Sequence, residues 1–233
     1  MKVTLIVPTL NEIEGMKEIM PRIKPEWYDR LIIVDGGSTD GTLEYARDHG
    51  YLVVSQTRRG MRYAYLEALA HADGDVVVTF SPDGNCVPER LPELIGKMRE
   101  GYDMAIVSRY AGEARSDDDS ALTSLANRVF TAAVNVLFRA RYTDAMVIFR
   151  AYKRDLIHAL DLDKDSSYFP AESIFRTIMS WEMLLSIRCA KRKLKVAEIP
   201  GDEPCRIGGR RPLHVMWGLA YILQLFQEAF VWR

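Results

Sequence analysis

The chain has 233 residues, of which 48% are hydrophobic and 27% are charged. This length and apolar content suffice to bury a substantial core, and we expect one domain spanning residues 1–233. The formal net charge of −1 excludes recognition of nucleic acid or anionic lipid by overall charge, so any such partner would need a local patch. No nucleic-acid partner is expected.

The three cysteines, Cys86, Cys189 and Cys205, are odd in number and widely spaced. That pattern favours structural thiols in a reducing compartment over a disulfide framework. The apolar opening of the chain is short and meets Pro8 and Asn11, so no signal peptide is predicted. No uninterrupted apolar run reaches about 18 residues, so no membrane-spanning helix is predicted either.

The first half of the chain alternates strand and helix patterns, which is typical of a parallel sheet covered by helices. Helices are predicted beyond Asn11, after Asp40, at 60–72 and from Pro88 onward, the last burying Leu91, Leu94, Ile95 and Met98. The predicted strands of this half cover residues 2–7, 30–35, 51–55, 75–80 and 103–108.

The composition changes after Tyr110, where "AGEARSDDDS" (111–120) is small, polar and charged and indicates a mobile loop. Apolar residues then follow helical spacing from Leu122 to Leu137. The remaining predicted elements are a strand at 145–150, helices near 152–160 and 171–190, a strand at 194–200 and a terminal helix.

Three of the predicted strands end in residues that carry side-chain oxygen atoms. Thr9, Asn11 and Glu12 follow the first strand, Asp35 closes the second, and "SPDGN" (81–85) follows the strand at 75–80. The carboxyl ends of parallel strands meet at one edge of a sheet, where ligands bind in open α/β folds. The simpler alternatives stay open: Thr9, Asn11 or Asp40 could cap helices, and Asp83 could be a solvated turn residue.

Asp83 and Asn85 suit a hard cation such as Mg²⁺ or Mn²⁺, which takes few protein oxygens and completes its shell from phosphate and water. Asp35 closes the apolar run "LIIV". A carboxylate there would meet a large desolvation cost unless the strand end is open to a ligand. Both observations predict a ligand-binding site at the edge of the sheet where these strands end.

Three segments together resemble family 2 glycosyltransferases of the GT-A fold: "VPTLNE" (7–12), "IIVDGGSTDGT" (32–42) and "ADGDVVVTFSPDGNCVPE" (72–89). The later half resembles the dolichol-phosphate mannose synthase branch, the polyprenyl-phosphate glycosyltransferases. Its matching segments are "VSRY" (107–110), "SLANRVF" (124–130), Asp144 five residues before "FR", and "RIGGRR" (206–211).

The resemblance implies an α/β GT-A nucleotide-diphospho-sugar transferase fold, with a mostly parallel central sheet and helices on both faces. Residues 1–110 would form the nucleotide-binding half, 111–211 the acceptor half and 212–233 a C-terminal amphipathic helix. The implied nucleotide-binding residues are Pro8, Thr9, Asn11, Glu12, Asp35 and Arg59.

Asp83 and Asn85 match the metal motif of the family, so Mg²⁺ or Mn²⁺ is the implied cofactor. Two positions depart from the usual pattern: Ser81 stands where the first aspartate of the metal motif is common, and Gly36 stands where a second aspartate often follows Asp35. One carboxylate fewer weakens a cation site, although Mg²⁺ often uses one or two carboxylates plus substrate phosphates.

The implied reaction is the inverting transfer of a hexose from a GDP- or UDP-sugar to a polyprenyl phosphate, dolichyl or undecaprenyl. Asp83 would act through the cation, and Arg109, Arg206, Arg210 and Arg211 would bind the acceptor phosphate. A phosphate acceptor is already ionised. A hydroxyl acceptor would need a general base, for which Asp144 and Glu182 are candidates. Otherwise Asp144 could begin a strand, Glu182 could lie on a solvated helix face, and the arginines could form a solvated loop.

The C-terminal stretch combines aliphatic residues with Trp217, Tyr221, Phe226, Phe230 and Trp232. It fits core packing, a contact between two copies in a homo-oligomer, or a helix at the membrane interface. With the resemblance, the last predicts an enzyme located in the cytoplasm, peripheral at the cytoplasmic face of a membrane.

Three other functions stay open. The first is transfer to a saccharide hydroxyl in surface polysaccharide synthesis, and the second is a non-catalytic nucleotide-sugar-binding subunit. A nucleotidyltransferase is disfavoured because the first strand lacks a glycine-rich, lysine-containing phosphate loop.

Overall fold

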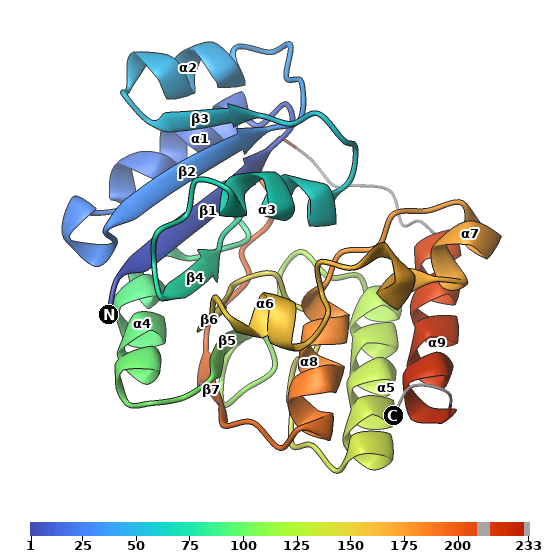
Figure 1. Cartoon of the computed structure of the whole chain (residues 1–233). Helices are drawn as coiled ribbons and strands as arrows, with labels where there is room; N and C mark the ends of the chain where they lie inside the picture. The colour runs from blue at the N-terminus through green and yellow to red at the C-terminus, as the bar shows by residue number, and fades with distance from the viewer. Residues whose placement is uncertain (209–214, 231–233) are drawn as a thin grey trace.

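The computed structural model describes residues 1–208 and 215–230 and contains one seven-stranded sheet (Figure 1). The strand order is β3-β2-β1-β4-β6-β5-β7. β6 is antiparallel to both neighbours, and the other pairs are parallel. The strands are β1 (Val3–Thr9), β2 (Arg30–Asp35), β3 (Leu52–Ser55), β4 (Val76–Thr79), β5 (Met104–Ser108), β6 (Arg150–Lys153) and β7 (Val196–Pro200).

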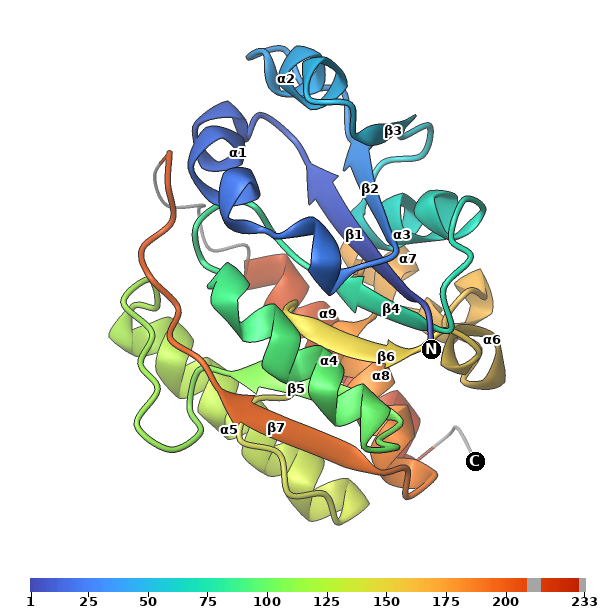
Figure 2. The same ribbon diagram turned by 90° about the vertical axis from the view of Figure 1, so that its left-hand side faces the viewer.

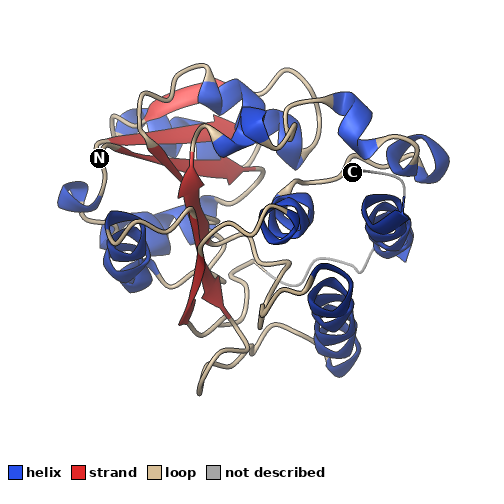
Figure 3. Cartoon of the chain, turned by 60° about the horizontal axis from the view of Figure 1, so that its bottom comes forward, coloured by secondary structure: helices blue, strands red, loops and turns tan. Residues whose placement is uncertain are grey.

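The predicted mostly parallel sheet with helices on both faces is confirmed. Figure 2 shows α1 and α4 on one face and α5, α8 and α9 on the other, and Figure 3 shows the sheet twisting along its length. The helices are α1 (Ile13–Ile19), α2 (Thr42–Asp48), α3 (Met61–Leu69), α4 (Leu91–Arg99), α5 (Ala121–Phe138), α6 (Leu156–Ala159), α7 (Ala171–Phe175), α8 (Glu182–Lys191) and α9 (Val215–Phe230), with short 3-10 turns at Met20–Arg22, Pro25–Trp27, Pro88–Arg90 and Asp165–Tyr168.

The central strands follow directly from their apolar sequences. Every residue of β1 is buried, and β1 pairs in parallel with β2 on one side and β4 on the other. Thr9 lies opposite Asp35, so the polar ends of β1 and β2 share one edge of the sheet. α4 covers the sheet with Leu91, Leu94, Ile95 and Met98, as predicted. Cys86 and Cys189 are buried free thiols, whereas Cys205 is exposed.

Three predicted elements differ from the structure in position or extent. The strand expected at 145–150 begins only at Arg150, because the Asp144 side chain accepts hydrogen bonds from the backbone of Met146 and Val147 and holds that segment in a turn. The helix expected near 152–160 is therefore only the short α6. The helix expected at 171–190 is divided into α7 and α8, since Arg176 adopts a left-handed conformation with φ of 48°.

Candidate active site

The ends of β1 and β2 form a hydrogen-bonded rim. Asp35 is buried, and its carboxylate accepts hydrogen bonds from the backbone of Gly37 and Ser38. Asn11 accepts from the backbone of Thr39, and its own backbone N–H donates to Ser38. These contacts satisfy the buried carboxylate, and they shape two adjoining loops around the carboxyl ends of the strands.

Asp40 and Thr42 tie these loops to the helices that follow. Asp40 accepts from the backbone of Ile13 at the start of α1 and of Thr42 at the start of α2, and the Thr42 hydroxyl accepts from the backbone of Glu12. Asp40 therefore accepts from first-turn N–H groups of both helices, but the N-cap residue of α2 is Gly41 and not Asp40. Thr9 and Pro8 are buried at the end of β1, where Pro8 lies opposite Val34.

The turn after β4 carries Asp83 and Asn85 and is covered by residues 204–207. The backbone N–H of Ile207 donates to the Asp83 carbonyl at 2.7 Å, and the Asn85 side-chain amide donates to the Pro204 carbonyl at 2.8 Å. Gly84 has φ of +94°, and an added Cβ would lie 2.8 Å from Ile207 Cγ1. Glycine is therefore required here both by backbone conformation and by space.

Arg206 connects this turn to the end of β1. Its guanidinium group donates to Asp83 through Nη1 and to Glu12 through Nη2, although Glu12 and Asp83 lie in segments far apart in the sequence. Glu12 and Asp83 are each 5% exposed as whole residues. The structure thus brings together four predicted site residues: Glu12, Asp83, Asn85 and Arg206.

The position of the Arg206 guanidinium group tests whether a divalent cation suits this site. Two buried carboxylates converge on one positive group, so the site demands positive charge. Asp83 supplies a carboxylate, Asn85 an amide oxygen, and Ser81 a hydroxyl on the same turn, a donor set that matches Mg²⁺ or Mn²⁺. The residues fit the implied metal, with Arg206 as the stand-in cation.

Arg109 lies at the centre of a second charged group, the Arg109 cluster, formed with Asp119, Asp144 and Glu203. Its guanidinium group pairs with Asp144 at 2.6 Å and lies 3.3 Å from Glu203 and 3.6 Å from Asp119. Burial by itself raises the pKa of the Asp144 carboxyl, but Arg109 and hydrogen bonds outweigh it and hold that pKa below 3.8. Burial raises the pKa of the Glu203 carboxyl.

Glu182 begins α8 and is 6% exposed rather than solvated. Its carboxylate accepts hydrogen bonds from the Tyr65 hydroxyl at 2.6 Å and from the Ser180 hydroxyl. Burial, followed by the nearby Glu182 charge, raises the pKa of Tyr65 well above its ordinary value. Asp144 and Glu182 are both enclosed, and both have their oxygens engaged.

Of the three remaining predicted arginines, the structure describes only Arg59. Arg59 is exposed in the loop after β3. Arg210 and Arg211 lie outside the described residues, so their predicted phosphate contacts stay predictions.

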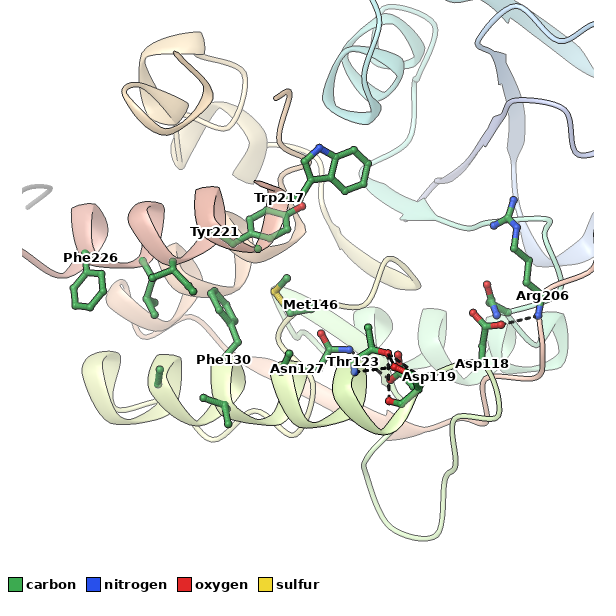
Figure 4. A pocket seen from close by; sticks show the side chains of 18 residues that line it. Asp118, Asp119, Thr123, Asn127, Phe130, Met146, Arg206, Trp217, Tyr221 and Phe226 are labelled. Carbon is green, nitrogen blue, oxygen red and sulfur yellow. Dashed lines mark hydrogen bonds between the residues drawn. The ribbon is translucent and has the colours of Figure 1, made fainter. Parts of the chain in front are cut away.

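An apolar groove of about 780 Å³ runs between α5 and α9 and reaches the Asp83–Asn85 turn (Figure 4). Phe130, Tyr221 and Phe226 line its apolar part. Its polar end is formed by Asn85, Asp118, Asp119 and Arg206. In Figure 4, α5 and α9 lie alongside each other, with Arg206 and Asp118 at one end of the groove.

The two helices that border the groove turn their polar residues inward. On α5, Asn127, Thr131 and Asn135 recur every four residues; Asn127 donates to Tyr110, Thr131 accepts from the backbone of Ala145, and Asn135 bonds the backbone of Tyr142. Val134 of α5 is buried, but five other large apolar residues of this helix are exposed, namely Leu122, Leu125, Val129, Val136 and Leu137.

α9 has the same inverted arrangement. Glu228 is buried against Arg188 and Lys191, and Gln224 donates to the carbonyl of Ser167. The exposed large residues of α9 are Met216, Trp217, Leu219, Ile222, Phe226 and Phe230. Within the described residues, α5 alone meets the length and composition expected of a membrane-crossing helix, with 11% of it buried; the sequence had predicted no such helix.

Several residues of the site were not predicted. Asp118 and Asp119 belong to the segment read as a mobile loop, yet Asp118 accepts from the Arg206 backbone and Asp119 faces Arg109. Arg128 lies over the Tyr110 ring at 4.9 Å, next to the groove residue Asn127. The sequence signal available for them was the acidic run at 117–119, which lies between the arginine-containing segments "VSRY" (107–110) and "SLANRVF" (124–130).

A mostly parallel sheet with polar and charged side chains gathered at the carboxyl ends of its strands is the arrangement in which open α/β folds bind their ligands. The sequence profile of glycosyl transferase family 2 matches residues 4–160. The chain belongs to this family, and the resemblance inferred from its motifs is confirmed.

Curated relatives support the same assignment. Glycosyltransferase AglJ of Haloferax volcanii is 30% identical over 85% of this chain and 61% of its own length. Undecaprenyl-phosphate mannosyltransferase of Micrococcus luteus is 27% identical over 94% of this chain and 95% of its own length. Of the other curated relatives, several are longer, and the chain spans only 43% and 54% of two of them.

A solved structure confirms the fold. Glucosyl-3-phosphoglycerate synthase from Mycobacterium tuberculosis, in complex with Mn²⁺, UDP and glucosyl-3-phosphoglycerate, has a TM-score of 0.71, is 23% identical, and is matched over 98% of this chain and 80% of that one.

Proposed function

We propose that the chain transfers a hexose from a nucleotide sugar to a polyprenyl phosphate at a membrane surface, with inversion at the anomeric carbon and with a divalent cation. The groove between α5 and α9 carries this proposal. It joins an apolar channel to the charged turn at Asp83, which is the shape required by an acceptor with a long apolar chain and a phosphate at one end.

The enclosed carboxylates favour a phosphate over a hydroxyl acceptor. A hydroxyl group needs a general base within hydrogen-bond reach, but Asp144 is paired with Arg109 and Glu182 is bonded to Tyr65 and Ser180. An ionised phosphate attacks without a base. We therefore assign Asp144 and Glu182 positioning roles: Asp144 orients Arg109, and Glu182 fixes α8 beneath the groove.

The donor would bind at the rim formed by the loops after β1 and β2, with its base and ribose near Thr9, Asn11 and Asp35. A cation held by Asp83 and Asn85 would neutralise charge on the departing diphosphate. Arg206 lies within reach of the same position and would stabilise that charge through its guanidinium fork. GDP- and UDP-sugars are both candidate donors.

The inverted helices α5 and α9 support a peripheral membrane location. α9 buries Gln224 and Glu228 and exposes Trp217, Phe226 and Phe230, an arrangement that suits an apolar exterior. Contact with a bilayer would place the open side of the groove where a polyprenyl chain is dissolved. As in the sequence-based prediction, we assign this contact to the cytoplasmic face.

The test is release of nucleoside diphosphate from GDP- and UDP-hexoses, with Mg²⁺, Mn²⁺ or EDTA, and with a short prenyl phosphate or undecaprenyl phosphate. Each buried methylene contributes about 0.8 kcal/mol, so the long acceptor should have the lower KM.

Ala133→Trp would fill the groove, which Ala133 lines, and should lower kcat/KM for the long acceptor about tenfold or more without changing nucleotide affinity. Ala132→Trp, at a neighbouring exposed position that does not line the groove, is the control.

Three outcomes contradict parts of the proposal. Release that is independent of any lipid phosphate but dependent on a saccharide favours a hydroxyl acceptor. Nucleotide binding with no release under any condition favours a non-catalytic binding subunit. Equal activity in EDTA and in Mn²⁺ removes the cation requirement.

A further inference from the structure

We propose that Arg206 is a displaceable counter-ion at the cation site, so that a divalent cation and the nucleotide diphosphate bind this chain cooperatively. In the nucleotide-free chain the Arg206 guanidinium group holds Asp83, and it must leave Asp83 before a cation can bind. The inference rests on the proposed function in one respect, because it takes Asp83 as a cation ligand.

Both carboxylate oxygens of Asp83 are engaged in the nucleotide-free chain. Oδ2 accepts from Arg206 Nη1, and Oδ1 accepts from the backbone N–H of Asn85 at 3.1 Å. A Mg²⁺ ion needs an oxygen ligand at about 2.0–2.1 Å, and a guanidinium group beside the same oxygen blocks that approach and repels the ion. Cation and guanidinium therefore compete for Asp83.

Glu12 explains why Arg206 stays in the absence of substrate. Glu12 and Asp83 are nearly buried, and the guanidinium group between them compensates both charges. Departure of Arg206 without a replacement would remove the guanidinium partner of the nearly buried Asp83 carboxylate in a poorly solvated site. A cation that binds alone must displace the Arg206 guanidinium group from Asp83, and it offers that group no new partner.

The backbone that carries Arg206 is held in place on both sides. The Pro204 carbonyl accepts from the Asn85 side chain, the Ile207 N–H donates to Asp83, and the Arg206 N–H donates to Asp118 at 3.1 Å. Movement of Arg206 is therefore a rotation of its side chain. The loop itself does not have to open.

A diphosphate helps the cation to bind at Asp83, and it also gives the displaced Arg206 guanidinium group a new partner. Its oxygens supply further ligands for the cation, and they accept the two N–H groups of a guanidinium fork in place of Asp83. Each ligand then raises the affinity for the other by the same factor, because binding free energies are linked reciprocally. This coupling ensures that the cation site fills when a donor is present.

The experiment measures free Mn²⁺ by electron paramagnetic resonance, without nucleotide and with UDP or GDP. Arg206→Gln should bind Mn²⁺ alone about tenfold more tightly than the unaltered chain, and the gain on adding nucleotide should shrink by a similar factor. Arg206→Lys keeps the charge but loses the fork, so it should lie between the two. Arg47→Gln removes one charge from an exposed position on α2 and should leave Mn²⁺ affinity unchanged.

Adding Asp83→Asn to Arg206→Gln should abolish the tight Mn²⁺ binding, which locates the site. Equal Mn²⁺ affinity in Arg206→Gln and the unaltered chain, or an unchanged gain on adding nucleotide, overturns the inference and leaves the proposed transfer intact. Absence of Mn²⁺ binding in every variant, even with nucleotide, overturns the cation requirement as well. If Arg206→Gln does not fold, as judged by circular dichroism, Arg206→Lys is compared with Arg47→Gln instead. Tighter Mn²⁺ binding by Arg206→Lys then supports the inference, and equal affinity overturns it.

Discussion

Arg188 of α8 and Glu228 of α9 form an ion pair of 2.7 Å in which both side chains are almost fully buried. Lys191 lies 3.2 Å from the same carboxylate, so one glutamate compensates two cations of α8. This contact turns the polar side of α9 toward the protein. The apolar side of α9 is thereby left facing outward.

Glu228→Gln should destabilise the fold by about 3–5 kcal/mol, because it breaks the buried ion pair between Arg188 and Glu228. Urea unfolding followed by circular dichroism measures this loss. Glu14→Gln is the control: Glu14 pairs with Lys17 at 3.4 Å on the exposed side of α1, and its loss should cost less than about 1 kcal/mol. A similar cost for both variants would contradict the structural role of Glu228.

Asp144 should make stability depend on pH in a defined direction. Its pKa is lower in the folded chain, so its contribution is fully present above about pH 4, the unfolded pKa, and is lost as pH falls through the folded pKa. The difference in unfolding free energy between the unaltered chain and Asp144→Asn should therefore be constant near neutrality and shrink in acid. Denaturant titrations from neutral pH downward measure it, and a difference that grows in acid would contradict the ion pair with Arg109.

The sequence predicted the parallel half of the sheet well because its signals are local. Apolar runs closed by glycine, proline and asparagine mark β1, β2 and β4, and the parallel pairing brings their ends to one edge. The displaced start of β6 has a different origin. The Asp144 side chain bonds nearby backbone groups, and its other oxygen pairs with Arg109, which lies 35 positions earlier in the sequence.

The central contact of the site could not be predicted in this way. Arg206 is 123 positions from Asp83 and 194 from Glu12, and only the packing of residues 204–207 on the β4 turn brings the three together. The face of α5 that packs against the protein could not be predicted from the sequence either. Its helical spacing was correct, but the pattern does not say that the stripe through Asn127, Thr131 and Asn135 faces the protein.

Gly84→Ala and Gly96→Ala should have opposite effects. An added methyl group at Gly84 strains the left-handed backbone and meets Ile207, so we expect a loss of about 1–2 kcal/mol and a large loss of transfer activity as residues 204–207 are displaced. Gly96 lies within α4 with open space around it, so alanine there should stabilise the chain by about 0.5–1 kcal/mol and leave activity unchanged. Thermal unfolding and diphosphate release measure the two effects. Normal turnover in Gly84→Ala would show that residues 204–207 do not have to rest on the turn.

Binding of the chain to lipid vesicles should depend on the outward face of α5. Leu125 and Val136 are 59% and 80% exposed and project from the same side of the helix. Replacing both by glutamate removes apolar contacts and adds charge at the bilayer surface, so vesicle affinity should fall about tenfold or more. Co-sedimentation with phosphatidylcholine vesicles, with and without anionic lipid, measures the change.

Leu52→Glu is the matched control, because Leu52 is 42% exposed on β3, at the opposite edge of the sheet from β7, and makes no part of this face. It should leave vesicle binding unchanged. The double variant should also keep its nucleotide affinity, since neither Leu125 nor Val136 lines the groove or the cation site. Loss of self-association in the double variant, in place of a loss of vesicle binding, would assign the outward faces of α5 and α9 to a contact between two copies of the chain.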